Sequence, residues 1–307
     1  MSRYHHQHHV HEHAHVTKNL RFAFFINLCF TILEIIGGIF TNSVAILSDA
    51  IHDLGDTIAI GLSWYFENYS KKESTHKYTY GYGRFSLVSA LINSTILLIG
   101  SGIIISKAIP RFIHPEEVKP FYMILFAIVG VVANGAAVFK LKKGKSLNQR
   151  VVRLHLIEDV LGWVAVLIGS IVIYYTGWLI VDPILSMMIA AYIFFNAGRN
   201  LLATFKVLLQ TTPEEVDFLL LEKELQQLDN VEEAHDIHIW SLDGNYNIMS
   251  IHIVVEDNTP MPRILQIKLQ ARDIIRKYNI NHETMQVDYK SEECIFQNCV
   301  DEEHQHE

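Results

Sequence analysis

Two short stretches of the sequence carry the same pair of metal-binding side chains at the same spacing. His52 precedes Asp56 by four residues, and His155 precedes Asp159 by four residues. Residues four apart lie on one face of an α-helix, so each stretch would present an imidazole and a carboxylate together. A single intramembrane His or Asp often only holds helices together, but two matching pairs can surround one point. Two imidazoles and two carboxylates form a tetrahedral set suited to Zn²⁺.

The chemistry of these groups narrows the expected ion. If the two helices run antiparallel, each histidine faces the aspartate of the other helix. Neutral imidazole suits Zn²⁺, Co²⁺ and Ni²⁺, whereas carboxylates alone would favour Mn²⁺ or Mg²⁺ and Cu⁺ prefers sulfur. Asp49 lies on the same helical stripe and either guides the ion, carries a proton or contacts a neighbouring helix. Glu34 and Asp182 are interpreted as structural.

The helices that hold these pairs are expected to cross a membrane. Half of the residues are hydrophobic and only 19% are charged. A helix needs about 20 apolar residues to cross the hydrocarbon of a bilayer. Six runs of about that length occur, at residues 22–40, 44–66, 85–106, 121–139, 154–175 and 178–197. The sequence therefore predicts an α-helical membrane protein with six transmembrane helices, the metal-binding pairs being in the second and fifth.

Lys and Arg set the expected orientation of these helices. The segments that flank the runs on one side of the predicted bilayer carry 14 Lys and Arg, against 3 on the other side. Positively charged flanks stay in the cytoplasm, so both termini are predicted to be cytoplasmic. The first run follows a polar, His-rich stretch and lacks a cleavage site, so it is not interpreted as a signal peptide. These features fit a bacterial inner membrane, and a protein of an organelle membrane would show the same features.

The last third of the chain differs in composition. Residues 1–210 carry 18 Lys and Arg and 12 Asp and Glu, whereas residues 211–307 carry 7 and 21. Nucleic-acid binding needs concentrated positive charge, so this acidic part excludes that function. Periodicity predicts a helix at 213–228 capped by Thr211 or Thr212, two strands around a turn at 243–244, a helix at 261–278 and a strand at 283–289. The expected fold is a small α+β ferredoxin-like domain of αββαβ order.

Four segments are expected along the chain. They are a His-rich cytoplasmic tail (1–18), the six-helix transmembrane domain (19–208), the cytoplasmic αββαβ domain (209–290) and an acidic tail with Cys and His (291–307). Seven histidines lie between residues 5 and 15 and indicate a low-affinity zinc-binding tail, because their irregular spacing argues against a purification tag. An H-E-x-x-H match within this low-complexity stretch does not indicate a protease, because that motif needs an ordered helix.

The strands of the cytoplasmic domain carry a further set of candidate ligands. A hairpin turn at 243–244 would place His235 directly opposite His252. A third strand in the same sheet would bring Asp288 near. Strict alternation along the first strand puts His238 on the opposite face from His235, where it would only pack.

These features together resemble the cation diffusion facilitator family of zinc transporters. The resemblance rests on the stretches HDLGD and HLIED, the six apolar runs, GYGRF and HDIHIWSLDG, and extends from about residue 18 to residue 288. It implies a homodimer that exports Zn²⁺ in exchange for protons. It also implies a transport site made of His52, Asp56, His155 and Asp159.

The resemblance extends to a cytoplasmic zinc site. Its positions correspond to His235, His252 and Asp288, while Gln286 stands where some bacterial relatives have a further histidine. The acidic domains of two protomers would repel each other, and bound Zn²⁺ would reduce this repulsion. Zn²⁺ is therefore expected both as transported substrate and as regulatory ligand. Cys294 and Cys299 resemble the thiol-bearing tail of some family members and either bind metal or belong to a disordered end.

Three classes of function compete for a membrane protein with such a ligand set. An intramembrane zinc enzyme needs a catalytic water and a general base, and the sequence offers no such constellation, so an enzyme is not expected. A zinc sensor has no need of four ligands within the bilayer. An ATP-driven pump is excluded because no G-x-x-x-x-G-K-[ST] loop occurs. Transport is the expected function, with a Co²⁺, Cd²⁺, Mn²⁺ or Fe²⁺ exporter of the same architecture as the alternative.

Overall fold

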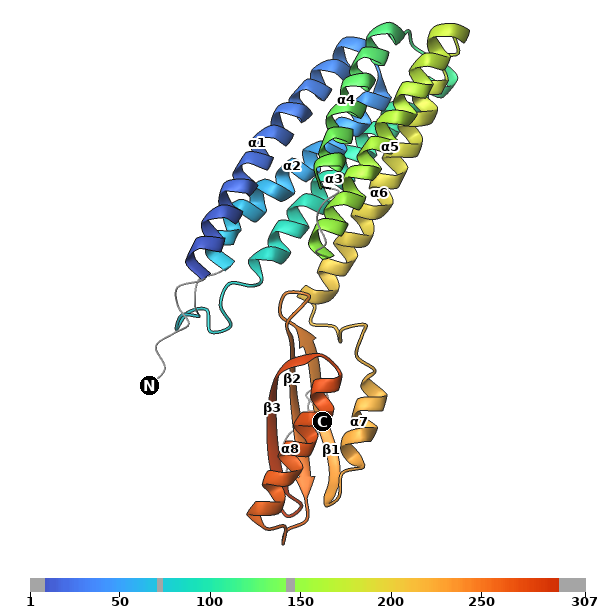
Figure 1. Ribbon diagram of the computed structural model, residues 1–307. Coiled ribbons are helices and arrows are strands. Elements are labelled where there is room, and N and C mark those ends of the chain that lie inside the picture. Colours follow the sequence, from blue (N-terminus) through green and yellow to red (C-terminus); the bar gives the residue numbers. More distant parts are fainter. Residues whose placement is uncertain (1–8, 71–73, 142–146, 293–307) are drawn as a thin grey trace. The chain divides into compact units, whose positions relative to one another are not determined.

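The computed structural model describes residues 9–70, 74–141 and 147–292. The chain divides into two compact units. The helical unit comprises residues 1–73 and 88–201, and the α/β unit comprises residues 74–87 and 202–307. Long helices make up the first unit, whereas the second is built on a small sheet (Figure 1).

Six long helices follow one another through the first two-thirds of the chain. Each covers all or most of one predicted apolar run. Among the described residues, four of these helices contain a stretch long and apolar enough to cross a bilayer, namely Phe24–Thr41, Phe85–Ile113, Ile157–Thr176 and Val181–Leu208. The helices are α1 (His9–Thr41), α2 (Val44–Ser70), α3 (Phe85–Ile113), α4 (Pro120–Leu141), α5 (Leu147–Thr176) and α6 (Val181–Leu208).

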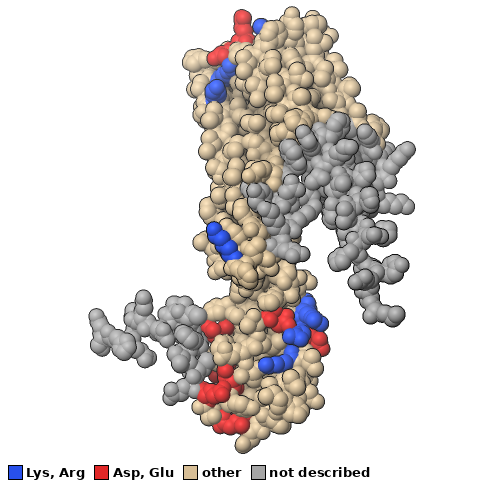
Figure 2. Space-filling view, turned by 90° about the vertical axis from the view of Figure 1, so that its left-hand side faces the viewer, with Lys and Arg blue, Asp and Glu red and all other residues tan. Residues whose placement is uncertain are grey.

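The outer surface of these helices is apolar. Ile39, Leu161 and Phe195 are 68%, 62% and 67% exposed. In Figure 2 the helical unit presents a broad surface with few Lys, Arg, Asp or Glu side chains. Water would disfavour so much exposed hydrocarbon, whereas lipid tails are as apolar as these side chains. The chain is therefore an integral membrane protein, as the sequence predicts.

Close contact between α4 and α5 fixes part of the helical unit. Trp163 of α5 is 1% exposed and packs edge-on against Phe30 of α1, with ring centroids 6.1 Å apart. Gly130 of α4 faces the same indole, and a Cβ at this position would lie 2.1 Å from the ring. Glycine at a membrane helix interface lets two backbones approach closely. Gly130 is therefore required for the observed distance between α4 and α5.

We expect Gly130→Ala to destabilise the protein by about 1–3 kcal/mol, because the rigid indole has to move away from the added methyl group. Gly135→Ala is the matched control, since a Cβ at that position of the same helix has no neighbour within 4 Å. Thermal unfolding in detergent measures both variants. Equal unfolding temperatures for the two would contradict the close α4–α5 contact.

The α/β unit contains a three-stranded sheet with two helices on one face. Its elements follow the predicted αββαβ order: α7 (Phe218–Gln226), β1 (Val231–Ser241), β2 (Asn247–Val255), α8 (Met261–Lys277) and β3 (Ile280–Tyr289). The strand order is β1-β2-β3, with β1 antiparallel and β3 parallel to β2. The core forms where Leu221 of α7 and Ile267 of α8 meet Ile251 of β2. The other face of the sheet carries the polar side chains.

The first helix of this unit is shorter than predicted. It begins at Phe218 rather than at residue 213, and its N-cap is Asp217, whose Oδ1 accepts a hydrogen bond of 3.1 Å from the Leu220 N–H. The expected caps Thr211 and Thr212 do not serve this helix. Aspartate is among the preferred N-cap residues because it satisfies an N–H that has no partner within the helix.

Candidate metal sites

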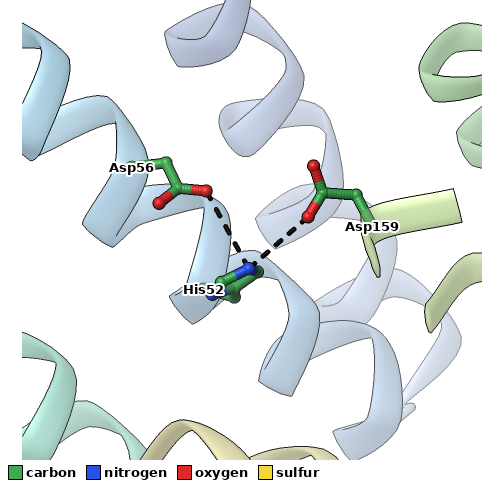
Figure 3. A group of neighbouring side chains, drawn as sticks. All are labelled: His52, Asp56 and Asp159. Carbon is green, nitrogen blue, oxygen red and sulfur yellow. Dashed lines mark ion pairs between the residues drawn. The ribbon is translucent and has the colours of Figure 1, made fainter. Parts of the chain in front are cut away.

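Three of the four predicted transport ligands come together where α2 and α5 lie side by side. His52 Nε2 is 3.5 Å from Asp159 Oδ1 of α5 and 3.9 Å from Asp56 Oδ2 of its own helix (Figure 3). One ligand atom from each of these three residues lies within 4.8 Å of the others. The prediction that His52 faces Asp159 is confirmed. Two ligands of one tetrahedral Zn²⁺ are about 3.4 Å apart, so this group needs only small movements to hold an ion.

The fourth predicted ligand is His155. It belongs to α5 and precedes Asp159 by four residues, which is about one turn. Its side chain lies outside the described residues. Its participation, and its contact with Asp56, stay predictions.

A pocket of about 220 Å³ adjoins two of the three ligands. His52 and Asp159 line it, together with the buried Asp49 carboxylate. A Cβ on Gly162 of α5 would lie 3.4 Å from Asp49 Oδ1, so a glycine leaves space beside this carboxylate. The remaining lining residues come from α5 and α6 and are Glu158, Met188, Ile189, Tyr192 and Ile193. His52 and Asp159 can therefore be reached from a partly polar space between helices.

Polar side chains also link α1 to α2 beside the site. The Asn27 amide donates to Thr57 Oγ1 at 3.1 Å, and the Thr31 and Thr57 hydroxyls are 3.2 Å apart. Glu34 is 2% exposed, and its carboxyl group lies within hydrogen-bonding reach of the buried carboxyl group of Asp53 on α2. A pair of buried carboxyl groups at bilayer depth is a candidate for function as well as for holding α1 against α2, so the structural interpretation of Glu34 stays a prediction.

Asp182 has the structural role that the sequence suggested. It lies in the first turn of α6, is 1% exposed and accepts hydrogen bonds at the start of α2. Its Oδ1 accepts from the Ser43 hydroxyl, and its Oδ2 accepts from the Val44 N–H at 2.9 Å. The Ala45 N–H adds a third bond at 3.3 Å. Asp182 therefore caps the helix that carries His52 and Asp56.

The candidate ligands of the α/β unit lie together on the open face of the sheet. His235 pairs with His252 across β1 and β2, as predicted, and their ring centroids are 5.6 Å apart. Asp288 of β3 places Oδ2 3.1 Å from His252 Nδ1. These three residues are more loosely grouped than the membrane ligands, which are the only described residues that bring three ligand atoms within 4.8 Å.

The expected position of His238 is wrong. A register shift separates the pair His235↔His252 from the pair His238↔Ser250, so an irregularity interrupts the alternation of β1. Ser250 and His252 are two apart on β2 and share a face, which places His238 on the same face as His235. The irregularity also brings Asp236 to this face, where its Oδ1 is 2.9 Å from His238 Nε2. Asp236 is a site residue that strict alternation missed.

Two known protein families match the chain. A family model of the cation efflux transmembrane domain matches residues 20–209, and a model of the cytoplasmic domain of cation efflux proteins matches residues 213–289. The chain belongs to the cation diffusion facilitator family. Facilitators of this family are transporters, so the chain is not an enzyme. The α/β unit matches the cytoplasmic domain of the family and is therefore a cytoplasmic domain.

Several curated facilitators are similar over nearly their whole length. Zinc transporter ZitB of Yersinia pseudotuberculosis is 34% identical over 278 residues, covering 89% of this chain and 88% of ZitB. The cadmium, cobalt and zinc/H⁺-K⁺ antiporter of Bacillus subtilis is 32% identical over 285 residues, covering 91% of each chain. The metal cation efflux system protein CzcD of Cupriavidus metallidurans is 32% identical over 284 residues, covering 90% of this chain and 89% of CzcD.

Two predicted metal-binding segments, the His-rich tail and the tail with the two cysteines, cannot be described at the level of side chains. Contrary to the expected low-complexity tail, α1 extends into the His-rich stretch from His9 on, but the side chains of this stretch lie outside the described residues. The same holds for Cys294 and Cys299.

Proposed function

We propose that this facilitator exports Zn²⁺ from the cytoplasm in exchange for protons, through a transport site of His52, Asp56, His155 and Asp159. The observation that carries the proposal is the convergence of His52, Asp56 and Asp159 from α2 and α5 inside the helical unit. Placing a charged side chain at bilayer depth costs at least about 2.5 kcal/mol of free energy, so a cluster of such side chains indicates a functional site. A divalent cation bound between them supplies that function.

Proton exchange follows from the chemistry of the ligands. An imidazole nitrogen binds Zn²⁺ only when it carries no proton, and a carboxylate ligand is ionised as well. Zn²⁺ and protons therefore compete for the same groups. If the site opens alternately to each side of the membrane, this competition becomes an exchange of one for the other. The name of the Bacillus subtilis relative, which describes an antiporter with H⁺, supports this coupling.

The ligand set also supports zinc as the substrate. Mixed nitrogen and oxygen ligands suit Zn²⁺, and the names of two of the relatives include zinc. The second candidate is a Co²⁺, Cd²⁺, Mn²⁺ or Fe²⁺ exporter of the same architecture, because the name of the Bacillus subtilis relative also includes cadmium and cobalt. A membrane zinc sensor, the alternative of a different class, would bind the ion without moving it.

The same proposal covers the architecture of the chain. Six helices would cross a bacterial inner membrane, with both termini in the cytoplasm. The segments are a His-rich tail (1–18), the transmembrane domain (19–208), the ferredoxin-like cytoplasmic domain (209–290) and the tail with Cys294 and Cys299 (291–307). Two chains would pair as a homodimer through their cytoplasmic domains.

We further propose that His235, His252 and Asp288 form a regulatory zinc site. Their position on one open sheet face, with Asp288 3.1 Å from His252, supports it. Bound Zn²⁺ would offset the repulsion between two acidic domains and hold them together.

Zinc uptake into proteoliposomes tests the transport proposal. We expect flux that rises when a pH gradient is imposed, with protons leaving the vesicles as Zn²⁺ enters. A pH-sensitive dye and a zinc-sensitive dye inside the vesicles record both ions. Zinc flux that is independent of the gradient would remove the antiport and leave facilitated diffusion. Binding without any flux would favour the sensor.

A further inference from the structure

The irregularity in β1 turns one aspartate toward the proposed cytoplasmic site. Asp236 lies between the paired residues His235 and His238, and its φ of 49° belongs to the left-handed region. Residues other than glycine rarely adopt this conformation, although aspartate adopts it more readily than most. Bulges of this kind re-aim a side chain and are frequent beside functional sites.

Regular alternation along β1 would point the Asp236 side chain into the core, away from the face that carries the histidines. Ala234 is 2% exposed in the core beneath the helices, and a regular strand would point Asp236 to that same face. The observed backbone instead places the carboxylate on the face of the histidines. Its side chain is 11% exposed there, and its Oδ2 is 3.9 Å from His252 Nε2.

The ring of His252 consequently lies between two carboxylates. Its Nδ1 is 3.1 Å from Asp288 Oδ2, and its Nε2 faces Asp236. Both carboxylates are held by a further side chain: Gln286 donates to Asp288 Oδ1 at 2.9 Å, and His238 Nε2 is 2.9 Å from Asp236 Oδ1. A metal ion takes only one nitrogen of an imidazole, and the other nitrogen usually donates its N–H to a carboxylate that fixes the ring.

We propose that Asp236 is the positioning residue of the cytoplasmic metal site. His252 binds Zn²⁺ through Nδ1 beside Asp288, and its Nε2–H donates to Asp236, which His238 holds in place. The separation of 3.9 Å closes by roughly 1 Å to form this hydrogen bond. The inference rests on the proposed regulatory site and is independent of the transport site.

Zinc binding to the full chain in detergent tests the role of Asp236. The parent protein carries Asp159→Ala, which removes the transport site. Binding to the cytoplasmic site is then the part of the zinc binding that is lost when His252→Ala is added. A chelating dye in competition measures the affinity. Asp236→Asn is expected to weaken this binding about 10- to 100-fold, as loss of an outer-shell carboxylate does at other metal sites. Glu232→Gln is the matched control, because this carboxylate of the same strand pairs with Lys290 at 3.0 Å and should leave the affinity unchanged.

Two further measurements separate a positioning role from other roles. The absorption bands of bound Co²⁺ should be the same in Asp236→Asn as in the parent protein, because the ligands are unchanged, whereas Asp288→Asn should shift them. Asp236→Gly accepts the left-handed backbone without strain, so it should fold normally and lose as much affinity as Asp236→Asn.

Three results would overturn the proposal. Unchanged zinc affinity in Asp236→Asn would remove any role for this carboxylate. Co²⁺ bands altered as in Asp288→Asn would make Asp236 a ligand. If His252→Ala abolishes no binding, the proposed regulatory site fails, and the role of Asp236 fails with it. The proposed transport site does not depend on this result, because zinc flux through the unaltered chain tests it separately.

Discussion

Asp159→Ala is expected to reduce zinc flux by about 100-fold or more, because it removes one ligand of the transport site. Loss of a residue that only supports a ligand already costs about 10- to 100-fold at metal sites. The change also leaves His52 without the carboxylate 3.5 Å from its Nε2. Zinc uptake into proteoliposomes, normalised to the amount of protein inserted, measures the effect.

Two variants make this experiment specific. Asp159→Asn keeps the size of the side chain and removes its charge, so it should lose flux as well even if Asp159→Ala disturbs the packing. Glu117→Gln removes a carboxylate exposed between α3 and α4 and should transport normally. Substantial flux in Asp159→Asn would rule out a charged ligand at this position, and with it the proposed four-ligand site.

The transport ligands could be predicted because helical periodicity decides their placement. Residues four apart must share a face, and only one assumption, that the two helices are antiparallel and level, was needed to bring His52 to Asp159. The structure places these two side chains 3.5 Å apart, as this assumption requires. Glu34 was harder to interpret, because the spacing of residues within α1 says nothing about which groups of α2 it meets.

The cytoplasmic site could be predicted only in part. The expected pairing of His235 with His252 assumed a two-residue turn, yet Ser241 pairs with Asn247, so the loop is one residue longer than such a turn requires. The shift at Asp236 compensates for this extra residue and restores the pairing. The longer loop and the register shift offset each other, so the alternation of polar and apolar residues reveals neither. This explains why His235 was placed correctly while His238 was assigned to the wrong face.

A second large effect is expected from Asp182→Ala, which removes the cap of the helix that carries two ligands. The buried carboxylate accepts from the Ser43 hydroxyl and from the Val44 and Ala45 N–H groups. These donors lie at the start of α2, where the helix offers them no acceptor and its dipole favours a negative charge. Leaving buried donors without partners costs about 1–3 kcal/mol each, so we expect a loss of about 3 kcal/mol in the free energy of unfolding.

Thermal unfolding and zinc flux together distinguish the two consequences of this change. The unfolding temperature in detergent should fall in Asp182→Ala, and Asp273→Ala, an exposed aspartate of α8, should leave it unchanged. Because the start of α2 sets the position of His52 two turns further on, flux per folded protein should fall as well. Asp182→Asn keeps an acceptor oxygen and should recover part of both losses. Normal stability and flux in Asp182→Ala would mean that α2 is positioned by its packing alone.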